Sequence, residues 1–218
     1  MFDKSFSLSD VFFLFRASLV TVALVAIGMG LGTVVGFVFG VIGACSRNRI
    51  WKALVASYVE FFRGTPLLIQ VFLIYFGLPL FGIDVPAIVA AGASLSIYTG
   101  AYMTEIARGG ILSVAKTQWE ASASIGLTFL QQMRYVILPQ AVRIMIPPSV
   151  GFLVGLVKDS SLMAVIGFME LTRVARLIGD RTLEPLLVIS IAGVIYFMIC
   201  YPLALLGRRL EKTLKSAD

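Results

Sequence analysis

A glutamate and an arginine stand near the start of a long apolar stretch of this sequence. Glu60 and Arg63 are three residues apart, so on a helix their side chains lie close enough to pair. Ionisable groups at membrane depth are costly to desolvate, which makes each of them a candidate functional residue. Either the two form a structural ion pair, or Arg63 faces a central cavity where it could meet the carboxylate of a substrate.

A second charged group interrupts a later apolar stretch. Lys158 and Asp159 carry opposite charges, and the hydroxyl side chains of Ser160 and Ser161 follow them directly. A zwitterion that crosses a bilayer needs partners of both signs, and an interrupted helix also offers free backbone groups. The cluster is therefore a candidate for substrate contact or gating, with structural pairing as the alternative.

The sequence lacks the residues for several other kinds of chemistry. It contains no histidine, and its two cysteines, Cys45 and Cys200, both lie in apolar stretches. Carboxylates do not cluster and no cysteine pair has ligand spacing, so we expect no metal site and no catalytic residue. The glycine-rich phosphate-binding motif of ATPases is also missing, so the chain should not hydrolyse ATP itself.

The composition indicates a membrane protein. Of the 218 residues, 59% are hydrophobic and 14% are charged, and the mean hydropathy is +0.95. A soluble domain carries about a quarter charged residues, because water must solvate its surface. The formal charge of +6 does not predict nucleic-acid binding, because the basic residues cluster between apolar stretches, as membrane orientation requires.

The apolar stretches predict an all-α integral membrane fold with five transmembrane helices in a single domain, residues 1–218. A helix needs roughly 20 apolar residues to cross a bilayer. The predicted spans are residues 17–45, 53–81, 85–107, 139–169 (interrupted near 158–161) and 185–207. In the first span a glycine recurs at every fourth position, which predicts close packing either within the chain or against another subunit. These glycines are Gly28, Gly32, Gly36 and Gly40.

Lysine and arginine predict the orientation. They gather in three segments: Arg47, Arg49 and Lys52; Arg108, Lys116, Arg134 and Arg143; and Arg208, Arg209, Lys212 and Lys215. By the positive-inside rule these segments, including the loop of residues 113–135, are cytoplasmic, so the N-terminus lies outside and the C-terminus inside. The external segment 170–184 has balanced charges and helical apolar spacing. It is either an interfacial helix or a surface that receives a substrate-binding protein.

Between the third and fourth spans the sequence predicts two short helices. Thr117 and Glu120 fit a capping box at the start of the first helix, and Gly126 can end it. Thr128 and Gln131 fit a second capping box. The apolar side chains that could enter the groove of a partner are Trp119, Ile125 and Leu127.

This cytoplasmic segment resembles the EAA loop of bacterial ATP-binding-cassette (ABC) importer permeases. The match consists of Glu120-Ala121-Ser122, Gly126 and Val136-x-Leu138-Pro139. It departs from the usual loop at two positions, with a serine for the third alanine and a valine for the isoleucine. Two further motifs, residues 60–70 and 158–162, resemble the subfamily that imports polar amino acids of the histidine, glutamine and cystine type. Residues 75–83 are most similar to those of cystine-type permeases.

The resemblance implies a type I ABC importer permease in the bacterial cytoplasmic (inner) membrane. The implied partners are a cytoplasmic ATPase dimer that uses ATP and Mg²⁺, a second permease subunit, identical or homologous, and an extracytoplasmic substrate-binding protein. Membrane lipid is a further expected partner. The chain itself is expected to bind neither a cofactor nor nucleic acid. The residues implied in ATPase coupling are Thr117, Trp119, Glu120, Ala121, Ser122, Gly126 and Leu127. Those implied in the substrate pathway are Glu60, Arg63, Gln70, Lys158, Asp159, Ser160 and Ser161.

Two other functional classes are alternatives. An ion-coupled secondary amino acid transporter would usually contain inverted repeats, and the sequence shows none. A membrane-embedded enzyme would need catalytic or metal-binding residues, which the sequence does not supply.

Overall fold

Every element of the computed structural model, which describes residues 5–215, is helical. The α-helices are α1 (Leu8–Cys45), α2 (Arg49–Gly64), α3 (Leu67–Phe72), α4 (Ala87–Leu112), α5 (Lys116–Ser124), α6 (Phe129–Gln132), α7 (Leu138–Asp159), α8 (Leu171–Thr182) and α9 (Pro185–Lys215). Shorter π-helical or 3₁₀ segments are Leu73–Gly77, Leu78–Phe81, Met133–Ile137 and Ser160–Ile166. The predicted all-α fold is confirmed over these residues.

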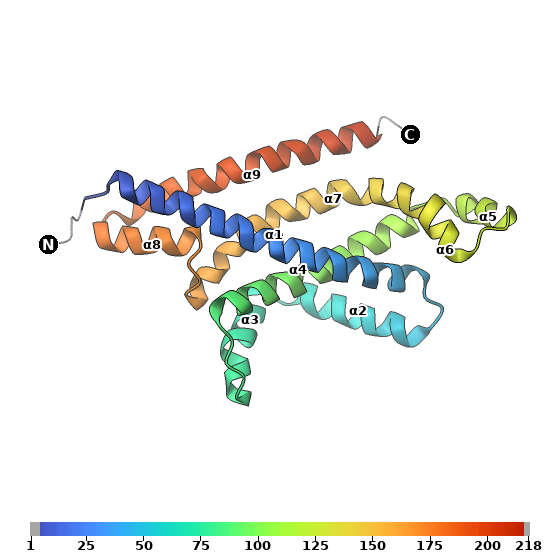
Figure 1. Ribbon diagram of the computed structural model, residues 1–218, viewed down its shortest axis with the longest axis horizontal. Coiled ribbons are helices and arrows are strands. Elements are labelled where there is room, and N and C mark those ends of the chain that lie inside the picture. Colours follow the sequence, from blue (N-terminus) through green and yellow to red (C-terminus); the bar gives the residue numbers. More distant parts are fainter. Residues whose placement is uncertain (1–4, 216–218) are drawn as a thin grey trace.

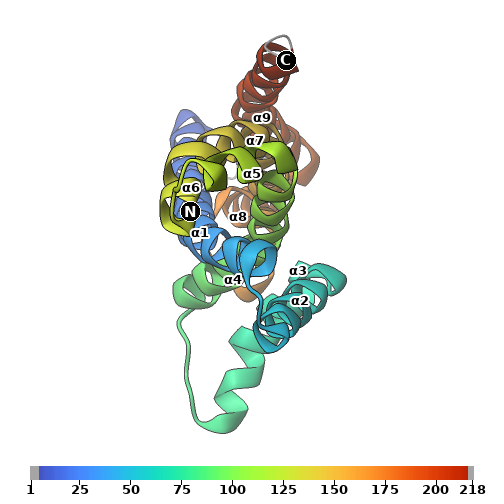
Figure 2. The same cartoon turned by 90° about the vertical axis from the view of Figure 1, so that its right-hand side faces the viewer.

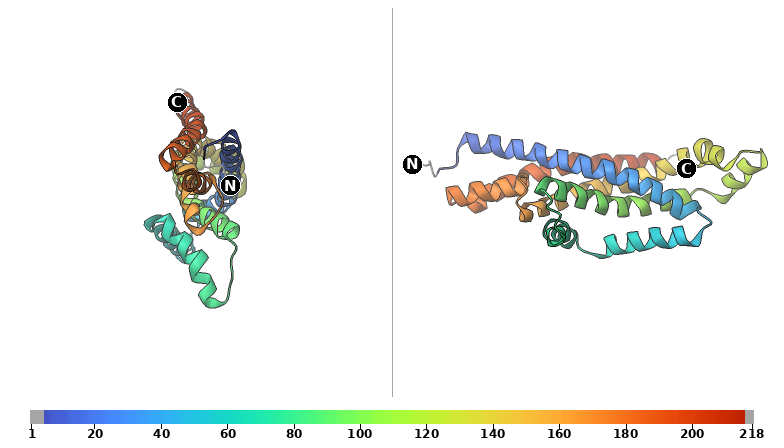
Figure 3. Two further views of the ribbon diagram at one scale, coloured as in Figure 1. Left: turned by 90° about the vertical axis from the view of Figure 1, so that its left-hand side faces the viewer. Right: turned by 60° about the horizontal axis from the view of Figure 1, so that its bottom comes forward.

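The long helices α1, α4, α7 and α9 run along the long axis of the molecule (Figure 1). The start of α1 lies beside α8 at one end, whereas α5, α6 and the end of α9 lie at the other end (Figures 1 and 3). The connection between α1 and α2 also lies at the end that holds α5 and α6. The three basic segments therefore gather at one end, which is the arrangement that the predicted orientation needs.

By length and composition, three helices of the described chain can cross a membrane: Leu8–Cys45, Phe129–Ile166 and Pro185–Thr213. The bent pair of α2 with Leu67–Phe81 adds a fourth if it is counted as one span. The predicted third span corresponds to α4, which is not one of these membrane-crossing helices. α4 is rich in small residues and packs against α1, α2 and α7. The interruption predicted in the fourth span corresponds to the change from α-helix to 3₁₀-helix at Ser160.

The predicted second span, residues 53–81, is not one straight helix. α2 and the segment Leu67–Phe81 meet at an angle of 102°. Pro66 has no N–H to donate and disfavours helical geometry in the residue before it, so Thr65 is extended (φ −111°, ψ 142°) and α2 ends there. The segment after the bend projects away from the other helices (Figure 2).

Glycines of α1 pack directly on α4. A Cβ atom built on Gly28 would lie 2.8 Å from the Cβ of Leu95, and one on Gly36 would lie 2.8 Å from backbone atoms of Met103 and Thr104. The other two glycines of the repeat also face α4. Helix backbones approach this closely only where side chains are absent. Of the two alternatives, the structure therefore supports packing within the chain.

Glu170 joins α8 to the rest of the bundle. Its fully buried carboxylate accepts hydrogen bonds from the backbone N–H groups of Thr172 (2.9 Å) and Arg173 (2.7 Å), which caps α8. It also accepts from the hydroxyl of Tyr196 on α9 at 2.8 Å. Burial raises the pKa of the Glu170 carboxyl above its usual value, because the charged form loses hydration, while these hydrogen bonds act in the opposite direction.

A substitution in the glycine repeat tests the contact between α1 and α4. Gly36→Ala places a methyl group against backbone atoms of α4, which cannot easily move aside, so it should destabilise the folded chain by about 1–3 kcal/mol. Thermal unfolding in detergent measures this effect. Gly30→Ala is the matched control on the same helix, because a Cβ there meets nothing within 4 Å. Equal stability of the two variants would mean that the helices do not pack this closely.

Candidate functional site

Aromatic side chains of α4 and α7 gather next to the arginine of the first charged motif. Arg63 lies at the end of α2, and its guanidinium carbon is 5.0 Å from the ring centroid of Tyr102. Tyr98 lies one turn earlier on α4, with its ring centroid 4.8 Å from that of Tyr102. Phe152 of α7 stacks on Tyr102, also at 4.8 Å. We refer to Tyr98, Tyr102 and Phe152 as the aromatic group.

Asp159 brings a negative charge to the same place. It is half-buried at the end of α7, and Tyr98 lies within electrostatic range of both Asp159 and Arg63. An arginine and an aspartate from separate sequence motifs thus both lie within electrostatic range of one tyrosine. One charge of each sign beside aromatic faces suits a small zwitterion, because a cation is attracted to the ring face and a carboxylate to the guanidinium.

Of the two alternatives for Glu60 and Arg63, the structural ion pair is not formed. Arg63 turns toward α4, where its Nη1 lies 4.0 Å from Oε2 of Glu105. Glu105 is bound more closely by Arg108, through two hydrogen bonds of 2.8 Å each. The charge of Arg63 is therefore only weakly compensated. Glu60 is exposed and has no ion pair within the part of the chain that the structure describes.

Gln70 and Ser160, both predicted in the substrate pathway, bind backbone groups. Gln70 is 3% exposed, and its Nε2 donates to the carbonyl oxygens of Phe62 (2.8 Å) and Thr65 (3.1 Å). Ser160 is fully buried and donates to the carbonyl oxygen of Val157 at 2.7 Å. These carbonyls lie at helix ends, where no helical N–H can reach them. Gln70 therefore stabilises the bend after α2, and Ser160 stabilises the end of α7.

Lys158 and Ser161 face a different space from Asp159. With Thr172 and Tyr196 they line a cavity of about 330 Å³ between α7, α8 and α9. The Ser161 hydroxyl also donates to the backbone carbonyl of Lys158 at 2.7 Å. Successive side chains on a helix diverge by about 100°, so the two neighbouring charges of this motif do not act at one point.

The aromatic group was not predicted from the sequence. Tyr98 and Tyr102 are four residues apart, which places them on one face of a helix, and this spacing is visible in the sequence. Their proximity to Arg63 and Phe152 is not visible there, because it depends on how α2 and α7 pack on α4.

α5 and α6 are the short helices predicted between the third and fourth spans. Gly126 follows the C-cap residue of α5, Ile125, and its φ of 82° is left-handed and suits glycine. The N–H groups of Gly126 and Leu127 donate to the carbonyl oxygens of Ala123 (2.9 Å) and Ser122 (3.2 Å). This pair of bonds is a Schellman motif, which confirms that Gly126 ends the helix.

One of the two predicted capping boxes is present. Thr128 and Gln131 cap α6 as predicted. α5 begins at Lys116 without a side-chain cap, so Thr117 lies inside the helix and the predicted box between Thr117 and Glu120 is wrong. Because α5 starts earlier than predicted, Lys116 belongs to the helix and lies one turn before Glu120. The two side chains form an exposed ion pair of 3.1 Å.

Trp119 faces inward and anchors α5. Its ring is half-buried, stacks with Phe129 (centroids 6.4 Å apart) and packs on the core formed by α4 and α7. Ser122 is also buried, whereas Glu120 and Ala121 are exposed. The most exposed large apolar side chains at this end are Ile125 and Leu130, at 76% and 75%. A partner at this surface would meet these two rather than Trp119.

Residues 36–216 match the family of binding-protein-dependent transport system inner membrane components. The chain belongs to this family. The permease is 39% identical to the probable amino-acid ABC transporter permease protein YckA of Bacillus subtilis, over 85% of this chain and 82% of the relative. It is 41% identical to the L-cystine transport system permease protein TcyB of the same organism, over 84% and 81%. It is 35% identical to the arginine transport system permease protein ArtQ, also of Bacillus subtilis, over 99% of both chains.

Solved structures agree with this assignment. The permease matches a chain in the crystal structure of an amino acid ABC transporter with histidines, with a TM-score of 0.78 and 35% identity, over 90% of this chain and 94% of that one. It also shares its fold with a chain of the inward-facing MetNI methionine ABC transporter (TM-score 0.82, 22% identity, covering 96% and 99%). The protein is a transporter subunit and not an enzyme, since ATP hydrolysis in ABC importers belongs to a separate ATPase. The ion-coupled alternative finds no support.

Gln70 offers a test of the bend after α2. Gln70→Glu turns carboxylate oxygens toward two backbone carbonyls and removes both donated bonds, so it should destabilise the permease by about 1–3 kcal/mol. Thermal unfolding in detergent measures the loss. Gln131→Glu is the matched control, because the exposed capping position accepts either residue. If Gln70→Glu unfolded at the same temperature as the control, Gln70 would not stabilise the bend.

Proposed function

We propose that the permease passes polar L-amino acids, cystine or a similar one among them, across the bacterial cytoplasmic (inner) membrane. The observation that carries this proposal is the contact of Arg63 with Tyr102, with Asp159 within electrostatic range of Tyr98. The amino acid carboxylate pairs with Arg63, whose nearest acidic neighbour is already bound by Arg108. The ammonium group lies between Asp159 and the tyrosine rings. Relatives named for L-cystine, glutamine and arginine transport support this substrate class.

The other residues predicted in the pathway have supporting positions in this proposal. Gln70 and Ser160 are positioning residues, which hold the helix ends that carry Arg63 and Asp159. Lys158 and Ser161 line the neighbouring cavity, which is separate from the aromatic group. Glu60 is exposed and lies outside the pathway as we propose it.

The proposed topology has five spans, with the N-terminus outside and the C-terminus in the cytoplasm. The grouping of the basic segments at the end that holds α5 and α6 supports it (Figure 3). α4 is the third span, in which small residues facing α1 replace the larger apolar residues of a lipid-facing helix.

Energy for transport comes from a cytoplasmic ATPase dimer, which binds ATP and Mg²⁺. In this proposal α5 docks on the ATPase through exposed residues such as Ala121 and Ile125, while Trp119 and Ser122 anchor it to α4 and α7. A second permease subunit, identical or homologous, completes the pathway. An extracytoplasmic binding protein delivers the substrate at the opposite end, where α8 lies.

Removing either charge beside the aromatic group should impair transport. Asp159→Asn and Arg63→Gln each remove a charge-assisted contact worth about 1.5–3 kcal/mol, so uptake at low substrate concentration should fall about tenfold or more. Uptake of radiolabelled cystine, arginine and glutamine into proteoliposomes that contain the complete importer measures this. Glu60→Gln is the control and should transport normally. Unchanged kinetics for every amino acid in both variants would remove these two residues from the pathway.

Gly126 tests the coupling proposal. A side chain there meets no atom within 4 Å, so only the left-handed backbone opposes substitution. Gly126→Asn should keep substrate-stimulated ATP hydrolysis, because asparagine tolerates this conformation, whereas Gly126→Val should lower it about tenfold. The measurement is ATPase activity of the reconstituted complex with and without substrate, with membrane insertion as a check. Full stimulation in the valine variant would show that the turn after α5 is not needed for coupling.

A further inference from the structure

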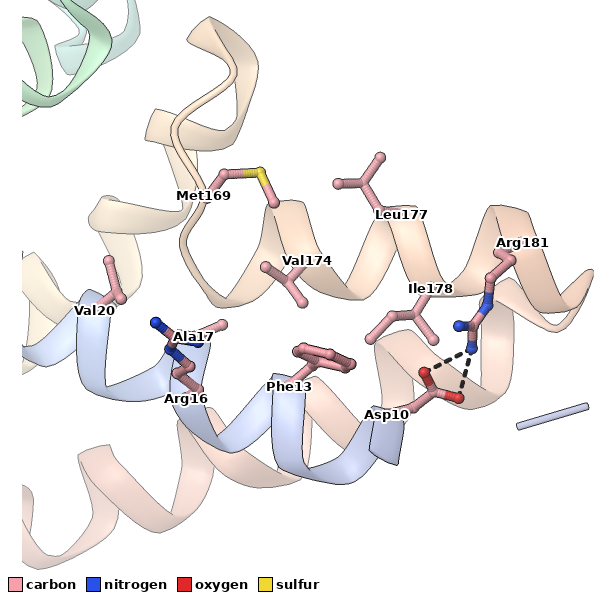
Figure 4. A pocket seen from close by; sticks show the side chains of 10 residues that line it. All are labelled: Asp10, Phe13, Arg16, Ala17, Val20, Met169, Val174, Leu177, Ile178 and Arg181. Carbon is pink, nitrogen blue, oxygen red and sulfur yellow. Dashed lines mark hydrogen bonds and ion pairs between the residues drawn. The ribbon is translucent and has the colours of Figure 1, made fainter. Parts of the chain in front are cut away.

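A groove runs between the start of α1 and α8 (Figure 4). Its volume is about 500 Å³. The apolar residues that line it are Phe13, Ala17, Val20, Met169, Val174, Leu177 and Ile178. Its charged lining residues are Asp10, Arg16 and Arg181.

The carboxylate of the one acidic residue that lines the groove already has hydrogen-bond partners within the chain. Asp10 is fully buried, and both of its carboxylate oxygens lie 2.6 Å from Nη2 of Arg181. Oδ2 of Asp10 also accepts hydrogen bonds from the backbone N–H and the hydroxyl of Ser7, at 3.0 and 3.1 Å. Asp10 and Arg181 therefore neutralise each other, so the Asp10 carboxylate is not available to pair with Arg16.

Arg16 contributes a positive charge that meets no acceptor in the part of the chain that the structure describes. Within residues 5–215 it forms no hydrogen bond or ion pair, and Figure 4 shows its guanidinium beside Ala17 and Val20. Exposed apolar side chains surround it on α1, with Phe13 48% and Phe15 59% exposed. A charge in such surroundings on a membrane-spanning helix is costly unless it reaches an anion or water.

The position of Arg16 along α1 matches the level of lipid head groups. It directly precedes the uncharged run that begins at Ala17 and continues to the end of the helix at Cys45. A long side chain at the edge of such a run extends toward the head groups. The apolar groove walls then lie where acyl chains begin.

We propose that this groove binds an anionic phospholipid of the surrounding bilayer, with its phosphate at Arg16 and an acyl chain along the apolar walls. The groove carries one uncompensated positive charge, which an anionic head group neutralises. Its walls require an apolar tail, which a soluble anion lacks. The proposal rests on membrane insertion and does not depend on the transported substrate or on the site beside the aromatic group.

Native mass spectrometry of the full-length permease in its transporter complex tests the proposal, with phosphatidylglycerol and phosphatidylcholine as the added lipids. We expect selective retention of phosphatidylglycerol, and a roughly tenfold lower affinity in Arg16→Gln, which loses a charge-assisted hydrogen bond. Arg16→Lys should retain most of the affinity. Arg176→Gln, at an exposed arginine of α8 outside the groove, is the matched control and should bind like the unmodified protein.

A second variant tests the tail of the lipid. Val20→Trp fills the groove from its rim and should also weaken phosphatidylglycerol binding, although Arg16 remains in place. Two results would overturn the proposal: equal retention of the two lipids by the unmodified protein, or unchanged phosphatidylglycerol binding in Arg16→Gln. A change of subunit stoichiometry in Arg16→Gln without a change in bound lipid would overturn it too, because a protein chain would then be the occupant.

Discussion

Contact between the backbones of α1 and α4 is the constraint on which the rest of this structure depends. The glycines of α1 bring α4 close enough for its small residues to interlock with them. α4 in turn carries Tyr98, Tyr102 and Glu105, the side chains that meet Arg63 and Phe152 from α2 and α7. The position of α4 against α1 therefore sets where charges from distant parts of the chain can meet. The proposed transport site therefore depends on helix packing rather than on any local motif.

The second feature that shapes the site is a helix interrupted by proline. α2 ends at Gly64, one residue after Arg63 and two before Pro66, so the arginine stands at a helix end and not in the middle of a continuous span. Carbonyl groups exposed by this interruption are bound by Gln70, which is buried for that reason. Interrupted backbone at membrane depth is stable only where protein groups or water satisfy it. The bend after α2 is therefore stabilised by the Gln70 side chain that binds its free carbonyl groups.

Features set by short-range sequence could be predicted, and those set by packing could not. Composition and apolar run length predict the helical membrane fold, and local rules predict the turn at Gly126 and the cap at Thr128. The charged residues near 158–161 predict an interruption of the fourth span, and the structure has a change to 3₁₀-helix at Ser160. The partner of Arg63 could not be predicted, because the choice between Glu60 and α4 depends on the packing of α2. The capping box at Thr117 failed because α5 starts earlier, where Lys116 can pair with Glu120.

The continuous helical segment Phe129–Ile166 has a mechanical consequence. α6 lies at one end of this segment, and Asp159 lies near the other. At 1.5 Å per residue the two are separated by roughly 45 Å, so a tilt of about 5° at α6 displaces the aspartate by roughly 4 Å. Such a displacement is as large as the distance between side chains in direct contact. The segment can therefore act as a lever, and a movement imposed at one end needs no relay of side chains to reach the other.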